Sequence, residues 1–296
     1  MRRQLIYGAP LDSSSAFPSF RLFWFLGFSY ASFMALLLQK AVLPLFPDMH
    51  AGHGLLMNDA TVFHNMAVEI AQRIHVSGWA EWRLYPQGAS ANVGLLSALY
   101  ALLGPDPAWF IPFNAAAHAT GALLIYRIGT VLVDSDVGKL GGLLAGICFV
   151  VFPSGLQWYG QNHKDAFAIV GSLLALNAWL TMHDQGFRVE WRNIWRVLFT
   201  AISGAVLLGV VRPYYVLVIV VGFSVSFLVS SIWRSCLRQI ALRLMFIILL
   251  AALAAGFARI GTAVGVYGEN PNTLNIGAYS ARTSEKFEWK ASEYVL

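Results

Sequence analysis

Long apolar runs constrain this chain more than any other feature of its sequence. A helix of about 20 apolar residues is needed to cross a hydrocarbon layer about 30 Å thick. Seven runs approach or exceed that length, and they cover residues 22–45, 107–132, 138–153, 165–182, 197–211, 213–232 and 243–265. Only 12% of the residues are charged, whereas a soluble domain has about a quarter. The sequence therefore predicts an all-α, polytopic bundle of about seven transmembrane helices.

The basic residues predict the orientation of this bundle, because Lys and Arg concentrate in cytoplasmic loops. One further apolar run, at 91–104, is too short to cross and is followed at once by prolines. If it stays outside the bilayer, most basic residues fall on the cytoplasmic side. They are Arg2, Arg3, Arg21, Arg127, Lys139, Arg188, Arg192, Arg196, Arg234, Arg238 and Arg243. We therefore expect the N-terminus inside, the C-terminus outside, and 59–77 and 91–104 as helices in the outer interface.

The composition also narrows the possible partners. The net charge of +5 reports topology in such a chain, so we expect membrane lipid and no nucleic acid as a partner. Cys148 and Cys236 are far apart and beside apolar runs, and we expect both to be free thiols. The first run has no cleavage site after a short apolar core, so it is expected to remain as a membrane anchor.

Polar residues gather where the first predicted outer loop forms a helix. Residues 59–77 (DATVFHNMAVEIAQRIHVS) place apolar side chains at helical spacing along one face. Asn58 or Asp59 fits the N-cap of that helix, where a polar side chain contributes about 1 kcal/mol. The sequence leaves open whether Asp59 only caps the helix or also takes part in chemistry.

A second acidic residue, Asp165, opens the fourth apolar run directly after Lys164. In this topology it lies on the same outer side as Asp59 and as Arg212, which stands in the RPYY break between two runs. Ionisable residues at a membrane boundary are costly unless they are paired or functional. Two carboxylates and two cations suit acid/base chemistry, or a divalent metal between Asp59 and Asp165. A helix cap for Asp165 and a topology flank for Arg212 stay open as simpler roles.

Several motifs follow one another in a characteristic order. An acidic residue opens a helix after the first run, in NDATVFHNMA, and YPQGASANVGLLSALYALLG comes next. Then follow the run AWFIPFNAAAHATGALLIYRIG, a short run that ends at Pro153, and a polar stretch that ends in Lys164-Asp165. Over about residues 20–232 this order resembles the GT-C superfamily of integral-membrane glycosyltransferases. The nearest branch is that of bacterial protein mannosyltransferases and lipid A aminoarabinose transferases.

The resemblance implies a reaction. Enzymes of that family take a sugar from a polyprenyl-phosphate carrier on the outer side of the membrane, usually with inversion. Asp59 matches the acidic residue that acts as general base on the acceptor hydroxyl, and Asp165 matches the second acidic position. Lys164 and Arg212 are the cations expected to stabilise the leaving phosphate. Of these, Arg212 is the better fit, because its fork matches two phosphate oxygens.

Further substrate-binding candidates are His64, Tyr85, Gln87 and His163. His64 lies about one and a half helical turns from Asp59, and its simpler role is that of a polar residue on an interfacial helix. Aminoarabinose transferases have Lys-Pro-Pro where this chain reads YPQG, so a phosphate-binding lysine is missing there. This difference favours the protein-mannosyltransferase-like side of the group.

The sequence thus predicts a transmembrane core at 1–265 and a polar outer tail at 266–296. Because relatives carry more spans or an outer domain, the tail is expected to be the remnant of a truncated or split member. The leading function is sugar transfer to an envelope glycan, lipid or protein, with the site facing the periplasm or exterior from a bacterial inner membrane. The alternative is a non-enzymatic protein: a polysaccharide transporter, a flippase subunit or an inactive relative. Polar groups at the outer ends, rather than at the bilayer midplane, favour the enzyme.

Overall fold

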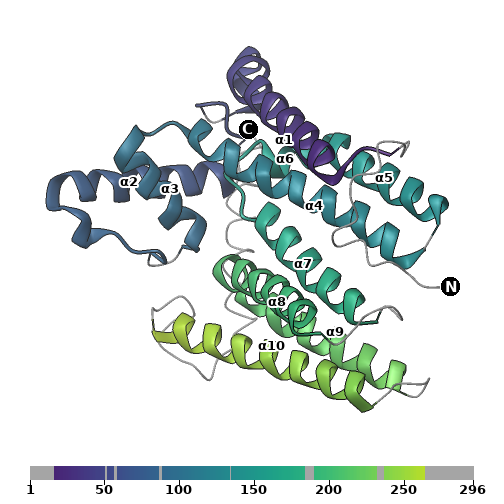
Figure 1. Cartoon of the computed structure of the whole chain (residues 1–296). Coiled ribbons are helices and arrows are strands. Elements are labelled where there is room, and N and C mark those ends of the chain that lie inside the picture. Colours follow the sequence, from purple (N-terminus) through teal and green to yellow (C-terminus); the bar gives the residue numbers. More distant parts are fainter. Residues whose placement is uncertain are drawn as a thin grey trace, which may run out of the picture.

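The structure is a computed structural model, and it describes residues 17–50, 52–56, 59–86, 89–133, 135–183, 190–231 and 237–263. Every regular element in these ranges is a helix (Figure 1). The predicted all-α class is therefore confirmed. The predicted outer tail at 266–296 lies outside the described residues.

Helix α4 (Ile111–Leu132) is the central element of the N-terminal half. It packs against α1 (Phe20–Leu37), α5 (Asp136–Val151) and α7 (Asp165–His183). Small residues let the backbones approach closely, which is how helices associate in a lipid environment. A Cβ added at Gly142 of α5 would stand only 2.4 Å from the carbonyl oxygen of Tyr126 in α4.

The C-terminal half is a second layer built on α7. Helix α8 (Trp191–Val211) packs along α7, and α9 (Pro213–Ser231) and α10 (Leu237–Ala263) pack on each other and on α8 (Figure 1). The rings of Trp179 and Phe223 stack with centroids 4.7 Å apart in the core of this layer. Together α4 and α7 join the two halves into one bundle.

Helices α2 (Asp59–Ser77) and α3 (Ala91–Leu103) form a hairpin that projects to one side of the bundle (Figure 1). Their shared core contains Ala67, Ile70 and Tyr100. Both segments are helical where the sequence predicted helices, and the first has the predicted bounds.

Among the described residues, five helical stretches are long and apolar enough to cross a membrane. They are Phe20–Leu45, Pro107–Leu132, Asp165–Met182, Trp191–Val211 and Ile240–Phe257. A sixth comes from α5 and α6 (Pro153–Tyr159) if the two count as one span, although they are bent by 65° at Phe152. The apolar part of α9, Tyr214–Ser230, is shorter than a usual span. All seven predicted runs are thus helical, and five of them have the length and composition of a span.

Several short helical turns interrupt or connect the long helices. After α1 the chain continues as a π-helical turn, η1 (Leu38–Val42), and then as 3₁₀ turns η2 (Leu43–Leu45) and η3 (Pro47–Met49). Further 3₁₀ turns, η4 (Trp79–Glu81) and η5 (Pro107–Phe110), flank α3. The polar stretch after Pro153, expected as a loop, instead begins with the short helix α6, because Pro suits the first turn of a helix but cannot continue one.

The outer faces of these helices are apolar and their interior holds polar side chains. Phe25 and Phe33 on α1 and Leu217 on α9 are exposed, whereas Asn114, Gln161 and Asn162 are buried. A soluble monomer rarely exposes such continuous apolar surfaces. This distribution agrees with the long apolar helices in indicating a membrane protein.

Candidate functional site

The turn between α6 and α7 carries three of the predicted site residues. Residues 160–164 make this turn, and α7 begins at Asp165. His163 is buried, while Lys164 and Asp165 are partly buried. A three-residue stretch thus presents an imidazole, a cation and a carboxylate at one end of the bundle.

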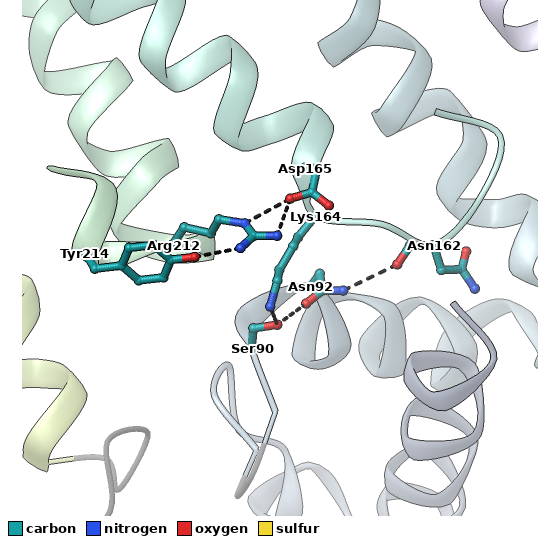
Figure 2. A network of polar contacts seen from close by, with 7 residues as sticks. All are labelled: Ser90, Asn92, Asn162, Lys164, Asp165, Arg212 and Tyr214. Carbon is teal, nitrogen blue, oxygen red and sulfur yellow. Dashed lines mark hydrogen bonds and ion pairs between the residues drawn. The ribbon is translucent and has the colours of Figure 1, made fainter. Parts of the chain in front are cut away.

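Arg212 meets this turn from the break between α8 and α9. The break exists because Pro213 follows, so Arg212 leaves the helical path while its N–H still reaches the carbonyl of Leu208. Its Nε donates to Oδ1 of Asp165 at 2.9 Å, and Nη2 contacts the same oxygen (Figure 2). Nη1 donates to the hydroxyl of Tyr214 at 2.6 Å. The guanidinium fork is therefore occupied by a carboxylate and a phenol.

The electrostatics of Arg212 follow from this pairing. Burial alone lowers the pKa of Arg212, but the contacts with Tyr214 and Asp165 outweigh it and raise the pKa above its ordinary value. Arg212 also lies over the ring of Tyr215, 5.5 Å from its centroid. Arg212 is thus a permanently charged group with fixed partners.

Lys164 has a different environment, and in Figure 2 its side chain runs from the turn toward Ser90. Its Nζ donates to the hydroxyl of Ser90 at 3.1 Å, and Ser90 in turn donates to Asn92 at the start of α3. Its ammonium also lies 5.5 Å from the ring centroid of Phe63. Burial, followed by repulsion from Arg212, lowers the pKa of Lys164, while the two aspartates act in the opposite direction.

Within the described residues, no carboxylate lies within salt-bridge distance of Lys164, whereas Asp165 is bonded to Arg212. Lys164 is therefore a partly buried cation that is held by a neutral hydroxyl. Arg212, the better fit expected from sequence, has its fork occupied, whereas Lys164 has no carboxylate partner in the described part of the chain. Lys164, rather than Arg212, has its charge available for an anion.

Asp59 is exposed and is the first residue of α2. Residues four apart share one face of a helix, so Asp59 lies on the same face as Phe63. The ring of Phe63 contacts the ammonium of Lys164. Asp59 lies close enough to Lys164 and His163 for its negative charge to oppose the lowering of their pKa values by burial. The structure thus brings Asp59 into the same neighbourhood as Lys164 and Asp165.

His163 lies among all four charged residues. Burial lowers the pKa of His163 and outweighs the nearby acids, which raise it, so the imidazole is neutral near pH 7. Its ring meets that of Trp158 edge to face, with centroids 5.6 Å apart. Its Nε2 atom is buried without a hydrogen-bond partner among the described residues.

The remaining candidates are not gathered into this cluster. His64 is buried, and its Nδ1 pairs with the hydroxyl of Tyr100 at 2.7 Å, which links α2 to α3. Burial, with a smaller effect of His53, lowers the pKa of His64 to about 4. Tyr85 lies in the loop before α3, and it makes no hydrogen bond or ion pair with the cluster in the part of the chain that is described. Gln87 lies outside the described residues.

The sequence suggested that Asp59 and Asp165 could hold a divalent metal between them. In the described ranges no group of three or more His, Cys, Asp or Glu side chains could hold a metal ion. One oxygen of Asp165 already accepts two bonds from Arg212. A metal would therefore have to compete with the guanidinium for that carboxylate.

An apolar cavity lies beside the charged cluster. It has a volume of about 350 Å³ and lies between α4, α5, α6 and the start of α7. Its wall includes Phe149, Trp158 and Ala166, the residue that follows Asp165. His118 also lines it, and its buried Nε2 has no partner among the described residues. The volume is within the range of small-molecule sites in proteins.

Sequence reasoning missed several residues around the cluster, among them Phe63, Ser90 and Tyr214, which contact it, and Asn92, which bonds to Ser90. Two of them had a usable signal. Phe63 lies four residues after Asp59, and Tyr214 lies in the same RPYY break as Arg212. Ser90 and Asn92 had none, because their part depends on how α3 meets the turn at 160–164.

The chain was also compared with other proteins. Family models, curated proteins and solved structures all gave no match to it. The functional argument therefore rests on the residues and their geometry.

Proposed function

We propose that this protein is a membrane glycosyltransferase that moves a sugar from a polyprenyl-phosphate donor to an acceptor hydroxyl on an envelope glycan, lipid or protein. The observation that carries the proposal is the environment of Lys164. It is a partly buried cation without a carboxylate contact among the described residues, two nearby acids act on its pKa, and Ala166, two residues further along the chain, lines an apolar cavity. A lipid-linked phosphate supplies the two things that this place lacks, an anion and an apolar chain.

Lys164 is the group that binds the phosphate in this proposal. A charged hydrogen bond to a phosphate is about twice as strong as a neutral one and repays part of the desolvation of the ammonium. Ser90 holds Nζ in place at 3.1 Å. As the bond to the sugar breaks, charge grows on the phosphate oxygen, and a preorganised cation stabilises it.

Arg212 acts as a second cation whose position is fixed by Asp165 and Tyr214. Its charge is partly neutralised by Asp165, so it contributes less attraction than a free arginine would. The role of Asp165 is then to orient Arg212. This role differs from the direct acid/base or metal-binding role expected from sequence.

Asp59 is the general base of the proposed reaction. It takes the proton of the acceptor hydroxyl while that oxygen attacks the anomeric carbon from the side opposite the phosphate. The bond between the anomeric carbon and the phosphate oxygen breaks, and its electron pair leaves with the phosphate. Asp59 suits this role because it is exposed to an incoming acceptor and yet lies on the helix face that meets Lys164.

The membrane arrangement belongs to the same proposal. Seven spans, with the N-terminus inside and the C-terminus outside, place Asp59, Lys164 and Arg212 on the outer side of a bacterial inner membrane. In that orientation α2 and α3 lie in the outer interface. The apolar cavity that Ala166 lines is then the space expected for the first part of the lipid chain.

The alternative is a non-enzymatic protein, such as a transporter or flippase subunit, or an inactive relative. The observation that favours it is the complete pairing of Arg212 with Asp165 and Tyr214, which is also what a purely structural ion pair would show. Transfer activity separates the two.

Replacement of Asp59 tests the proposal. Purified protein in lipid nanodiscs would be given polyprenyl-phosphate sugars with radiolabelled hexose or pentose and an envelope extract as acceptor. Asp59→Asn is expected to abolish transfer while the protein inserts normally. Glu69→Gln is the matched control, because Glu69 is an exposed acid on the same helix. Full activity of Asp59→Asn would remove Asp59 as the base, and an inactive wild-type protein would favour the alternative.

A further inference from the structure

The candidate site is assembled from two chain segments that are distant in sequence. One segment, residues 52–61, leads into α2 and delivers Asp59. The other, residues 160–165, delivers His163, Lys164 and Asp165. A reaction between groups on both segments requires that their separation be held constant, because a misplacement of about 1 Å can cost roughly a hundredfold in rate.

One buried side chain bonds both segments together. Gln161 is 1% exposed and lies directly before Asn162 and His163. Its Oε1 accepts from the backbone N–H of Leu56 at 2.9 Å, and its Nε2 donates to the carbonyl of Gly54 at 3.2 Å. Nε2 also donates to the carbonyl of Gly160 at 3.0 Å. The side-chain amide of Gln161 therefore forms hydrogen bonds with one N–H and one carbonyl of the 52–56 backbone, as a neighbouring β-strand would.

The 52–56 segment is in turn fixed to the first turn of α2. The hydroxyl of Thr61 donates to the carbonyl of Leu56 at 2.9 Å. Thr61 lies two residues after Asp59. A continuous path of hydrogen bonds thus runs from the turn that carries Lys164, through Gln161 and Leu56, to the start of the helix that carries Asp59.

Two further amides hold the other side of the turn. Asn114 of α4 donates to the carbonyl of Gln161 at 2.6 Å, and Gln39 donates to the carbonyl of Gly160 at 2.8 Å. Gln39 reaches the turn from the π-helical stretch after α1, and such stretches are frequent at functional sites. Gly54 has a φ of +67°, and a Cβ there would stand 2.0 Å from the carbonyl oxygen of Gln39. The 52–56 segment is therefore pressed against both the π-turn and Gln161.

Burial of these amide side chains costs free energy unless their polar groups are paired. Polar side chains in the interior of a membrane protein are retained where they are paired and functional. An apolar residue of similar volume at 161 would fill the same space without the polar groups. Such a residue would leave the N–H of Leu56 and the carbonyl of Gly54 without the bonds that now tie them to the 160–165 segment.

We propose that Gln161 is a positioning residue that fixes Asp59 relative to Lys164. The inference rests on the proposed function for its kinetic consequence, but the link between the two segments stands on the hydrogen bonds alone. Gln161 touches neither donor nor acceptor. It acts through the backbone of Gly54 and Leu56 on one side and of Gly160 on the other.

A distance measurement tests the link without any activity. Spin labels would be placed at Gln72→Cys on α2 and Gln157→Cys on α6, both exposed positions, after Cys148→Ser and Cys236→Ser. Double electron–electron resonance in nanodiscs then reports the separation of the two segments. Gln161→Met, which keeps the volume and removes the three side-chain bonds, is expected to broaden or shift the distance distribution. Asn177→Leu is the control, because it removes a buried amide from the middle of α7.

Kinetics in the same variants test the consequence. Gln161→Met is expected to lower kcat by roughly 10- to 100-fold and to leave the KM for the donor within about twofold, because Lys164 still holds the phosphate. Asn177→Leu should leave both values near those of the wild type.

An unchanged distance distribution in Gln161→Met would overturn the proposal, and so would a normal kcat. A rise in KM equal to the fall in kcat would also contradict it, since it would indicate general loss of structure. If the wild-type protein transfers no sugar but the distance distribution changes as expected, the proposed function fails and the link between the segments stands.

Discussion

Two of the ion pairs in the described part of the chain join distant segments, and their surroundings differ. Lys40 and Asp106 meet at 2.7 Å with side chains 49% and 43% exposed. Arg212 and Asp165 have side chains only 25% and 21% exposed, and Arg212 has Tyr214 as an additional partner. One pair is solvated on both sides, whereas the other is shielded by α7, α8 and the aromatic residues of the break.

Because their surroundings differ, the two pairs are expected to contribute differently to the free energy of unfolding. Water and salt compete with a solvated pair, so such pairs contribute about 0–1 kcal/mol. In a shielded pair each charge depends on the other, and removal of one partner leaves the second without compensation. Lys164, one residue from Asp165, is shielded in a similar way, but its partners among the described residues are a hydroxyl and an aromatic ring. That contrast is the basis for assigning the anion site to Lys164.

The largest effect on stability is expected from Arg212→Ala. It leaves Asp165 partly buried without its cation, and we expect a loss of about 3 kcal/mol in the free energy of unfolding. Unfolding of the protein in mixed micelles with increasing dodecyl sulfate measures this value. The double variant Arg212→Ala with Asp165→Ala should regain part of the loss. An equal loss in the single and double variants would show that the charges are independent.

A smaller effect is expected from pH at the buried neutral pair of His64 and Tyr100. The pKa of His64 is about 4 in the folded protein and near 6.5 in the unfolded chain, so the unfolded state binds more protons between these values. Stability should therefore fall as pH decreases from about 6.5 to 4, by roughly 2 kcal/mol in total from this residue.

The same unfolding assay at pH 7 and at pH 4.5, applied to the wild type and to His64→Gln, checks this prediction. The variant should lose less stability between the two pH values than the wild type does. An identical pH dependence would show that His64 is not the group responsible.

Lys40→Ala is expected to change the free energy of unfolding by less than about 1 kcal/mol, because its pair with Asp106 is solvated. The comparison with Arg212→Ala is direct, since both variants truncate a cation whose carboxylate partner lies in a distant part of the chain. A loss for Lys40→Ala as large as that for Arg212→Ala would break the distinction between the two pairs.

The smallest effect concerns salt. An increase from about 0.05 to 0.5 M sodium chloride should weaken the contribution of the exposed pair by a few tenths of a kcal/mol and leave the shielded pair nearly unchanged. Repeating the Lys40→Ala and Arg212→Ala measurements at both salt concentrations tests this. Greater salt sensitivity in the Arg212 pair would contradict the assignment of burial.

Much of the fold was accessible from sequence because apolar runs and helix signals are local. The helix at 59–77 has the predicted bounds, and the run at 107–132 is a single candidate span. The bend between α5 and α6 was missed, since the run at 138–153 ends in a proline that begins a new helix. The π-turn around Gln39 was also missed, because it depends on contacts with the turn at 160–161.

The site was predicted in part for the same reason. The order of helices places the starts of α2 and α7 and the end of α8 near one another. The charges of Asp59 and Arg212 therefore act on Lys164. The choice of partners was not predictable. Only the geometry of the break at Pro213 brings Arg212 onto Asp165, and only the position of α3 brings Ser90 to Lys164.

Lys164 is expected to bind the phosphate of a lipid carrier, and the affinity of the protein for farnesyl phosphate in nanodiscs measures this directly. The wild type should bind farnesyl phosphate more tightly than farnesol. Lys164→Gln should raise the dissociation constant for farnesyl phosphate at least tenfold, about 1.4 kcal/mol, and leave that for farnesol unchanged. Lys139→Gln, in which an exposed lysine paired with Asp136 is replaced, should bind like the wild type. Equal affinity of Lys164→Gln and the wild type for farnesyl phosphate would contradict the claim.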